Sequence, residues 1–133
     1  MSYPLAMATQ SDVRSIALSL AETREEEGHF AFSVRAGKKH KGFAWVWMER
    51  IAPRKPRVPC HEVLAVRVAD LEAKEILLMA DPQRFFTEPH YDGFPAVLVS
   101  LKEISRAALR DLLIDAWKVQ APKALVAKFK APS

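Results

Sequence analysis

The feature that most constrains the fold is a hairpin pattern early in the chain. Phe30, Phe32 and Val34 alternate with smaller or polar residues, which is the two-residue period of a β-strand. Gly37 lies in the polar turn that follows, and a second alternating run covers residues 43–48. Two strands joined by a short turn pair antiparallel, so the sequence predicts an antiparallel sheet.

Three further stretches have the period of amphipathic helices. Each begins after a residue that can cap a first helical turn, namely Thr9, Asp70 and Ser105. Apolar residues then recur at spacings of three and four. The predicted buried faces are Val13, Ile16, Ala17 and Leu20; Ala73, Ile76, Leu77 and Ala80; and Leu109, Leu112, Leu113, Ala116 and Trp117. Pro122 opens a last short helical segment, which we expect to run to Phe129.

More strands are predicted at residues 63–68, 85–87 and 96–100, and the prolines of segment 52–59 predict a loop or a frayed strand edge. The order is one helix, three strands, a helix, two strands and a helix. It predicts an α+β fold, with an antiparallel sheet and helices packed on one face. A chain of 133 residues, 50% of them hydrophobic, fits one domain over 1–133 with less ordered ends.

Cysteine content and hydropathy limit the compartment and the chemistry. Cys60 is the only cysteine, so no intramolecular disulfide and no Cys-x-x-Cys pair can form. Residues 1–7 lack the basic start and long apolar run of a signal peptide, and the apolar stretches elsewhere are short. We therefore expect a soluble cytoplasmic protein that does not associate with a membrane.

The net charge of +4 is unevenly distributed along the chain. Residues 1–34 carry two arginines against five acids, residues 35–57 carry eight Lys or Arg against Glu49, and residues 58–133 carry ten of each sign. The acidic run at Glu22 and 25–27 is expected to form a solvated helix end and connection. The basic stretch is the asymmetry that favours a polyanionic partner.

Basic side chains of this stretch are candidates for nucleic-acid contacts. They would touch phosphates and position a duplex without reading bases, which gives weak, salt-sensitive binding. Solvated hairpin tips are the alternative explanation, since edge lysines also discourage strand aggregation. If the first three strands are sequential neighbours, the two basic connections lie at opposite ends of the sheet. The candidates are Arg35, Lys38, Lys39, Lys41, Arg54, Lys55 and Arg57.

The second strand is apolar on both faces, because Phe43, Trp45 and Trp47 alternate with Ala44, Val46 and Met48. One set should meet the helices. If the aromatic set is the other one, it forms a platform for unpaired bases, a ligand or a second subunit, unless another segment covers it. Ordinary core or subunit packing explains the same pattern. The candidate partner or ligand face comprises Trp45, Trp47, His90 and Tyr91.

Two clusters could be imagined as metal ligands or as a nucleophile pair, Cys60-His61-Glu62 and Glu88-x-His90-x-Asp92. Neither has a recognised ligand spacing. Turn chemistry explains the second better, since Asp92-Gly93 is a hairpin-turn dipeptide. We expect no metal site, no cofactor and no catalytic residues, and hence no enzyme.

Three motifs in order resemble the MmcQ/YjbR family of small bacterial proteins, over about residues 11–125. They are residues 28–32 with 35–38, residues 80–86 with 89–95, and Ala116-Trp117 with Ala121-Pro122-Lys123. The resemblance implies a fold like that of secretion chaperones and a proposed double-wing mode of DNA binding, in which hairpins project from the body. It implies no catalytic residue set.

Three functions remain open from the sequence. The first is a non-enzymatic binding protein that contacts nucleic acid weakly through the basic segments. The second is a protein-interaction module, plausibly a homodimer, that uses the face around Trp45 and Trp47. The third is a small-molecule binder or enzyme with a pocket near Trp45, His90, Tyr91 and Asp92.

Overall fold

The computed structural model describes residues 7–130. Residues 1–6 and 131–133 lie outside the described residues. The expectations of less ordered chain ends and of no signal peptide concern these residues. The elements are α1 Gln10–Ser19, β1 Thr23–Glu25, β2 Ala31–Ala36, β3 Lys39–Glu49, β4 Val58–Arg67, α2 Leu71–Ala80, β5 Phe85–Phe86, β6 Ala96–Ser100, α3 Arg106–Gln120 and α4 Lys123–Ala127. Short 3₁₀ turns, η1 Pro89–Tyr91 and η2 Leu101–Glu103, flank β6.

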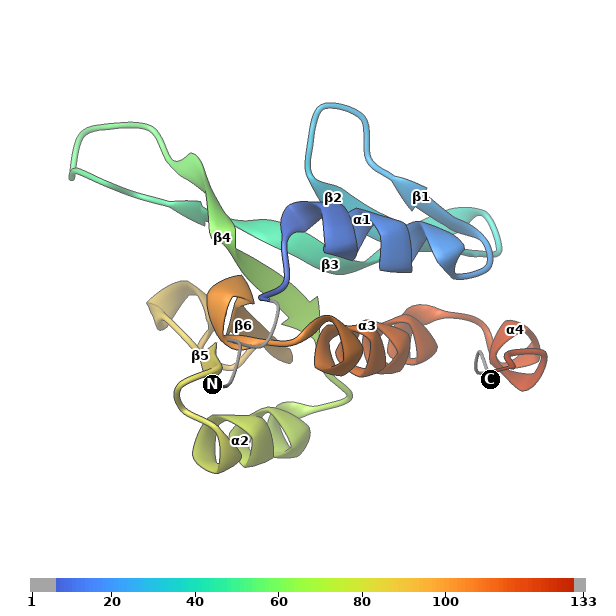
Figure 1. The fold of residues 1–133 in the computed structure, drawn as a ribbon. Helices are drawn as coiled ribbons and strands as arrows, with labels where there is room; N and C mark the ends of the chain where they lie inside the picture. The colour runs from blue at the N-terminus through green and yellow to red at the C-terminus, as the bar shows by residue number, and fades with distance from the viewer. Residues whose placement is uncertain (1–6, 131–133) are drawn as a thin grey trace, which may run out of the picture.

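The six strands form one antiparallel sheet in the order β1-β2-β3-β4-β6-β5. Helix α3 packs across β2, β3 and β4, and α1 packs beside it and against β1. Helix α2 contacts the other edge of the sheet, at β5 and β6. Figure 1 shows the β3–β4 hairpin projecting at one end of this body and the β2–β3 hairpin at the other end.

The predicted α+β class, the first hairpin and the capped helices are confirmed. Two strand assignments were wrong. The acidic run is not simply a helix end, because residues 23–25 form β1 on the edge of β2. Strand β4 begins at Val58 rather than at residue 63, because residues 58–60 pair with residues 47–49 of β3 in the outer part of the hairpin, Pro59 opposite Met48.

Strand β3 does not keep the strict alternation that its sequence shows. The β2–β3 register shifts between Phe32 and Ser33, so Phe32 pairs with Ala44, Ser33 pairs with Gly42 and Phe43 is bulged between them. Phe43 and Ala44 are therefore both fully buried in the helix-covered core. The three aromatic residues of β3 do not share one face, and only the two tryptophans remain outside this core.

Helix α3 supplies the centre of the core. Leu109, Leu113, Ala116 and Trp117 of its predicted stripe are fully buried, and the fifth predicted residue, Leu112, is half-buried. Trp117 Nε1 also donates to the carbonyl oxygen of Ala21 at 3.0 Å, which satisfies the indole N–H in an otherwise apolar setting. This hydrogen bond ties α3 to the end of α1.

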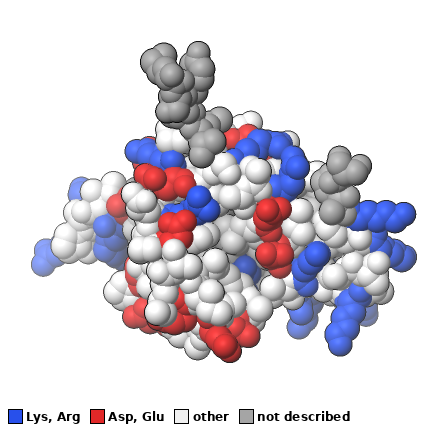
Figure 2. Space-filling model, turned by 60° about the horizontal axis from the view of Figure 1, so that its bottom comes forward, with Lys and Arg blue, Asp and Glu red and all other residues white. Residues whose placement is uncertain are grey.

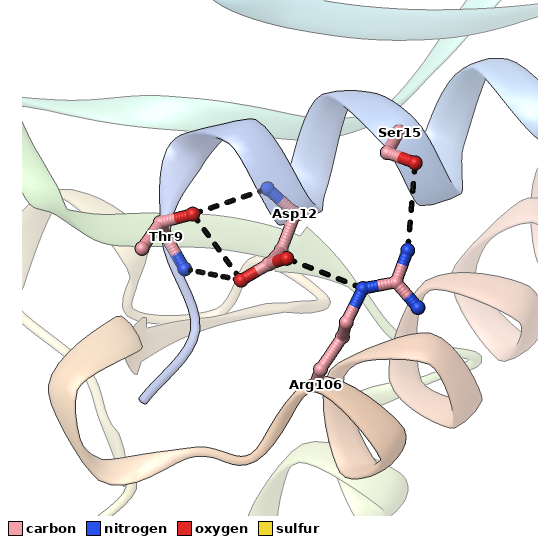
Figure 3. A network of polar contacts seen from close by, with 4 residues as sticks. All are labelled: Thr9, Asp12, Ser15 and Arg106. Atoms are coloured by element: carbon pink, nitrogen blue, oxygen red, sulfur yellow. Dashed lines mark hydrogen bonds and ion pairs between the residues drawn. The ribbon is translucent and has the colours of Figure 1, made fainter. Parts of the chain in front are cut away.

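A second link between α1 and α3 forms at the predicted start of α1. The Asp12 backbone N–H donates to Thr9 Oγ1, and the Thr9 N–H donates back to the Asp12 carboxylate, which completes a capping box. Arg106 of α3 donates to the same carboxylate at 3.2 Å and to Ser15 Oγ (Figure 3). The cap therefore also fixes how the two helices meet.

Replacing Leu113 with Ala should lower the free energy of unfolding by about 2–5 kcal/mol, because the change removes buried surface and leaves a cavity. Urea denaturation measures the loss. Leu18→Ala on α1 is the matched control, since Leu18 is 45% exposed and should cost no more than about 0.5 kcal/mol. Equal losses in the two variants would contradict the placement of α3.

Candidate functional site

A pocket of about 360 Å³ opens near the β3–β4 end of the sheet. Its walls come from β3, from Arg57 at the end of the β3–β4 connection and from the β5–β6 connection. This volume lies at the lower end of the range of small-molecule sites. The lining residues are Trp45, Trp47, Met48, Arg57, Glu88, His90, Tyr91 and Phe94. The four residues that the sequence suggested as a partner or ligand face thus come together here, whereas Asp92 does not line the pocket.

Trp45 is placed on this side of the sheet by small neighbours. Its direct cross-strand partners are Ala31 on β2 and Ala65 on β4, which leave room for the indole on their shared face. Its Nε1 donates to the hydroxyl of Tyr91 at 3.0 Å. Phe94 packs against it at an angle, with ring centroids 6.4 Å apart. Trp45 is therefore half-buried and is held by Tyr91 and Phe94 of the β5–β6 connection.

Trp47 is held less tightly than Trp45. The β3–β4 register shifts between Val46 and Trp47, so Trp47 lies opposite Cys60. It is half-buried, and no described aromatic ring pairs with it. Its indole Nε1 is buried and has no hydrogen-bond partner among the residues that the structure describes. The sequence left open whether this aromatic face is covered, and the structure shows that it is covered in part.

The connection from Glu88 to Phe94 closes one side of the pocket. Pro89 opens the 3₁₀ turn η1, and Gly93 adopts a φ of 75°, a left-handed conformation that glycine adopts without steric cost. Lys74 of α2 anchors the loop from behind, because its Nζ donates to the carbonyl oxygens of Tyr91 and Phe94. Desolvation lowers the pKa of Lys74 below its ordinary value.

The burial of Lys74 shows that the predicted buried face of α2 was wrong in part. Ile76, expected in the core, is 59% exposed, and Lys74 is only 5% exposed. Helix α2 lies at the sheet edge, so its buried stripe faces both the core, through Ala73 and Leu77, and the polar loop. A lysine can be buried there because backbone carbonyls satisfy its amine. Amphipathic spacing alone could not reveal this.

Polar groups line the mouth and wall of the pocket. One Arg57 guanidinium nitrogen lies 3.1 Å from His90 Nε2, and another donates to the Met48 carbonyl oxygen at 3.0 Å. Arginine is only a donor, so His90 Nε2 is the acceptor of this bond. Glu88 Oε1 is buried and has no partner within the described chain. The pocket thus combines aromatic walls with an arginine and an unpaired carboxylate oxygen.

The predicted nucleic-acid residues fall into two groups at opposite ends of β3, as the sequence indicated. Arg35, Lys38, Lys39 and Lys41 are exposed on the β2–β3 hairpin, and Arg54 and Lys55 are exposed on the β3–β4 hairpin. Along β3, Lys39 and Trp47 are eight residues apart, a span of about 26 Å. Arg57, which was also predicted to contact nucleic acid, does not belong to the second group, because it lines the aromatic pocket.

The structure adds lysines that sequence reasoning missed. Gln120 Nε2 donates to the Gly42 carbonyl oxygen at 2.9 Å, which brings the end of α3 to the base of the β2–β3 hairpin. Figure 2 shows Lys and Arg gathered at this end of the molecule, on the right. We call it the basic end and define it by the lysines of the β2–β3 hairpin, of the end of α3 and of α4 with its C-cap, which are Lys38, Lys39, Lys41, Lys118, Lys123 and Lys128. The sequence does contain a signal, because four lysines and no acidic residue follow residue 115. Counting the charges over all of residues 58–133, where the two signs balance, concealed it.

The acidic run lies elsewhere and is engaged locally. Arg14 donates to Glu25 at 2.7 Å, and this hydrogen bond lowers the pKa of Glu25. The buried Ser33 hydroxyl donates to Glu26 and lowers its pKa in the same way. Glu25 therefore links β1 to α1 and Glu26 contacts β2, whereas Glu22 and Glu27 are exposed, as expected of a solvated connection.

Within residues 7–130, no three His, Cys, Asp or Glu side chains are grouped so that they could hold a metal ion. Cys60 is a half-buried free thiol opposite Trp47. Glu88 and His90 both line the pocket, and Asp92 is exposed on the loop beside it.

No helix within residues 7–130 is long and apolar enough to span a bilayer.

The architecture defines a small α+β protein built on a six-stranded antiparallel sheet. No family model matches the chain. It is 39% identical over 133 residues to the uncharacterized protein Rv2570 of Mycobacterium tuberculosis, a match that covers 96% of this chain and 99% of that protein. The uncharacterized protein Mb2600 of Mycobacterium bovis matches equally. The chain belongs to the family of these mycobacterial proteins.

A solved structure with the same fold is that of Deinococcus radiodurans protein DR2400, a DUF419 domain. It matches with a TM-score of 0.61 over 84% of this chain and 77% of that chain. The sequences are 24% identical, so this likeness concerns the fold alone. Membership of the MmcQ/YjbR family itself stays a prediction from the sequence motifs.

Lys74→Met should destabilise the protein by about 1–3 kcal/mol, because the carbonyl oxygens of Tyr91 and Phe94 lose a charged donor. The loosened loop should also expose Trp45 and shift its fluorescence to the red. Denaturation and emission spectra measure both effects. Lys102→Met, at an exposed lysine, is the control. An unchanged spectrum in the Lys74 variant would show that the loop does not depend on this anchor.

Proposed function

We propose that the protein is a non-enzymatic binding protein that contacts duplex nucleic acid weakly and without base preference through its basic end. The observation that carries the proposal is the hydrogen bond from Gln120 to Gly42, since it holds the end of α3, which carries Lys118, against the hairpin that carries the lysines at 38, 39 and 41. Neither segment alone offers so dense a set of positive charges.

The lysines of the basic end are free to meet phosphates. None of them takes part in the ion pairs formed among residues 7–130. Lys118 lies 5.0 Å from the ring centre of Phe129, which holds its stem without neutralising its charge. Lysine is a point charge that suits phosphate contacts but reads no base edge. The expected binding is therefore sequence-tolerant and sensitive to salt.

The projecting hairpins agree with what the resemblance to the MmcQ/YjbR family implies. Figure 1 shows two of them, at opposite ends of the sheet. In our proposal the β2–β3 hairpin makes the main contact, because the end of α3 reinforces it. Arg54 and Lys55 at the other tip lie too far away to join the same patch.

Reversing Lys38, Lys39 and Lys41 to Glu should weaken binding to all duplex sequences about equally. Each lost phosphate contact should flatten the plot of log affinity against log salt by about 0.9, so the triple variant loses at most about 3 units of slope. Lys118→Glu combined with Lys123→Glu should lose at most about 2 units. Fluorescence anisotropy of labelled duplexes across a salt series measures both.

Arg54→Glu combined with Lys55→Glu is the control, because it makes the same charge change as the second variant at the other hairpin. It should keep most of the wild-type slope. Charge reversal in the acidic run would be a poor control, since Glu25 and Glu26 accept hydrogen bonds from Arg14 and Ser33. Equal weakening by both double variants, or no binding by the wild type at about 50 mM salt, would refute the basic end as the contact surface.

A second candidate function is a protein-interaction module that forms a homodimer. Two apolar side chains of the β3–β4 hairpin favour it, since Ile51 is 73% exposed and Met48 is 40% exposed. Sedimentation should then show a mass that rises with concentration, and Ile51→Asp should abolish the rise while Leu18→Asp does not. A constant monomer mass would exclude the homodimer.

A further inference from the structure

We propose that the aromatic pocket beside the β3–β4 hairpin binds a planar heteroaromatic ring that carries an anionic group, which is the chemistry of a nucleotide. Three observations carry this step. The walls offer aromatic surface, a half-buried arginine stands beside them, and two buried polar atoms of the lining side chains lack partners. The site is independent of the basic end, about 26 Å away along β3.

The ring would stack on Trp47. Trp45 and Phe94 already pack against each other, and Tyr91 packs against Phe94 with ring centroids 6.2 Å apart. Trp47 has no such partner within the described chain, although it lines the same pocket. Stacking of a base on an aromatic side chain is worth about 1–3 kcal/mol. The two unpaired groups complement a heterocycle, because Trp47 Nε1 donates and Glu88 Oε1 accepts.

The anionic group would meet Arg57. Its guanidinium is held by the Met48 carbonyl and by His90, so it is preorganised at the pocket rather than free in solvent. Its remaining donors suit a phosphate or carboxylate. Arg67, stacked over Phe94 at 5.1 Å, and Lys74 behind the loop add positive charge.

Tryptophan fluorescence provides a direct test, because Trp45 and Trp47 line the pocket while Trp117 is fully buried elsewhere. Adenosine monophosphate should quench the emission saturably. Adenosine should bind about tenfold more weakly, since it lacks the charged contact. A short single strand of deoxyadenylate distinguishes the sources: tighter binding than the mononucleotide assigns the pocket to an unpaired base, and weaker binding assigns it to a free nucleotide.

Arg57→Gln should weaken the binding of adenosine monophosphate about tenfold and leave adenosine unchanged. Lys55→Gln removes the same charge from the same hairpin outside the pocket and should change neither. Trp47→Leu should weaken both ligands, and Trp47→Phe, which keeps a ring, should restore part of the affinity. Melting temperatures confirm that each variant is folded.

The proposal is overturned if the wild type shows no saturable quenching at millimolar nucleotide, or if Arg57→Gln and Lys55→Gln act alike. It is also overturned if the emission changes with protein concentration alone, because the aromatic face would then be a subunit interface. Duplex binding in the same salt series separates the two proposals, since Arg57→Gln should leave it unchanged.

Discussion

The pairing of β3 on both of its edges is the constraint on which the rest of the structure depends. With 11 residues, β3 is the longest strand, and it is bonded to β2 on one side and to β4 on the other. A central strand satisfies all its backbone groups only within such a sheet. Its length separates the two hairpins, and its apolar residues must be covered on both faces. The basic end and the aromatic pocket are consequences of these two facts.

The two faces of β3 are covered in different ways. Helix α3 closes one face with a continuous apolar stripe, which excludes water and gives a rigid core. The loop from Glu88 to Phe94 covers the other face, and it depends on the buried amine of Lys74 and on one indole hydrogen bond. A loop held by a few polar contacts packs less completely than a helix, so a pocket remains there.

The two candidate sites use different cations for physical reasons. The basic end is built from lysines, whose mobile, hydrated charges meet a phosphate backbone without fixed geometry. The pocket uses Arg57, whose planar guanidinium is positioned by the Met48 carbonyl and by His90. Preorganised donors suit one ligand held in one pose. The dense lysine charges of the basic end thus suit a polyanion, and the single positioned arginine of the pocket suits a small ligand.

The sequence by itself determined the α+β class, the hairpin around Gly37 and the caps at Thr9, Asp70 and Ser105, because each depends on residues close together in the chain. It also predicted that the two basic connections lie at opposite ends of the sheet if the first three strands are sequential neighbours, which the strand order confirms. Only the tertiary structure decided the bulge at Phe43, the burial of Lys74 and the contact of Gln120, at the end of α3, with the β2–β3 hairpin. These features depend on contacts between distant segments, whose register and packing no local pattern encodes.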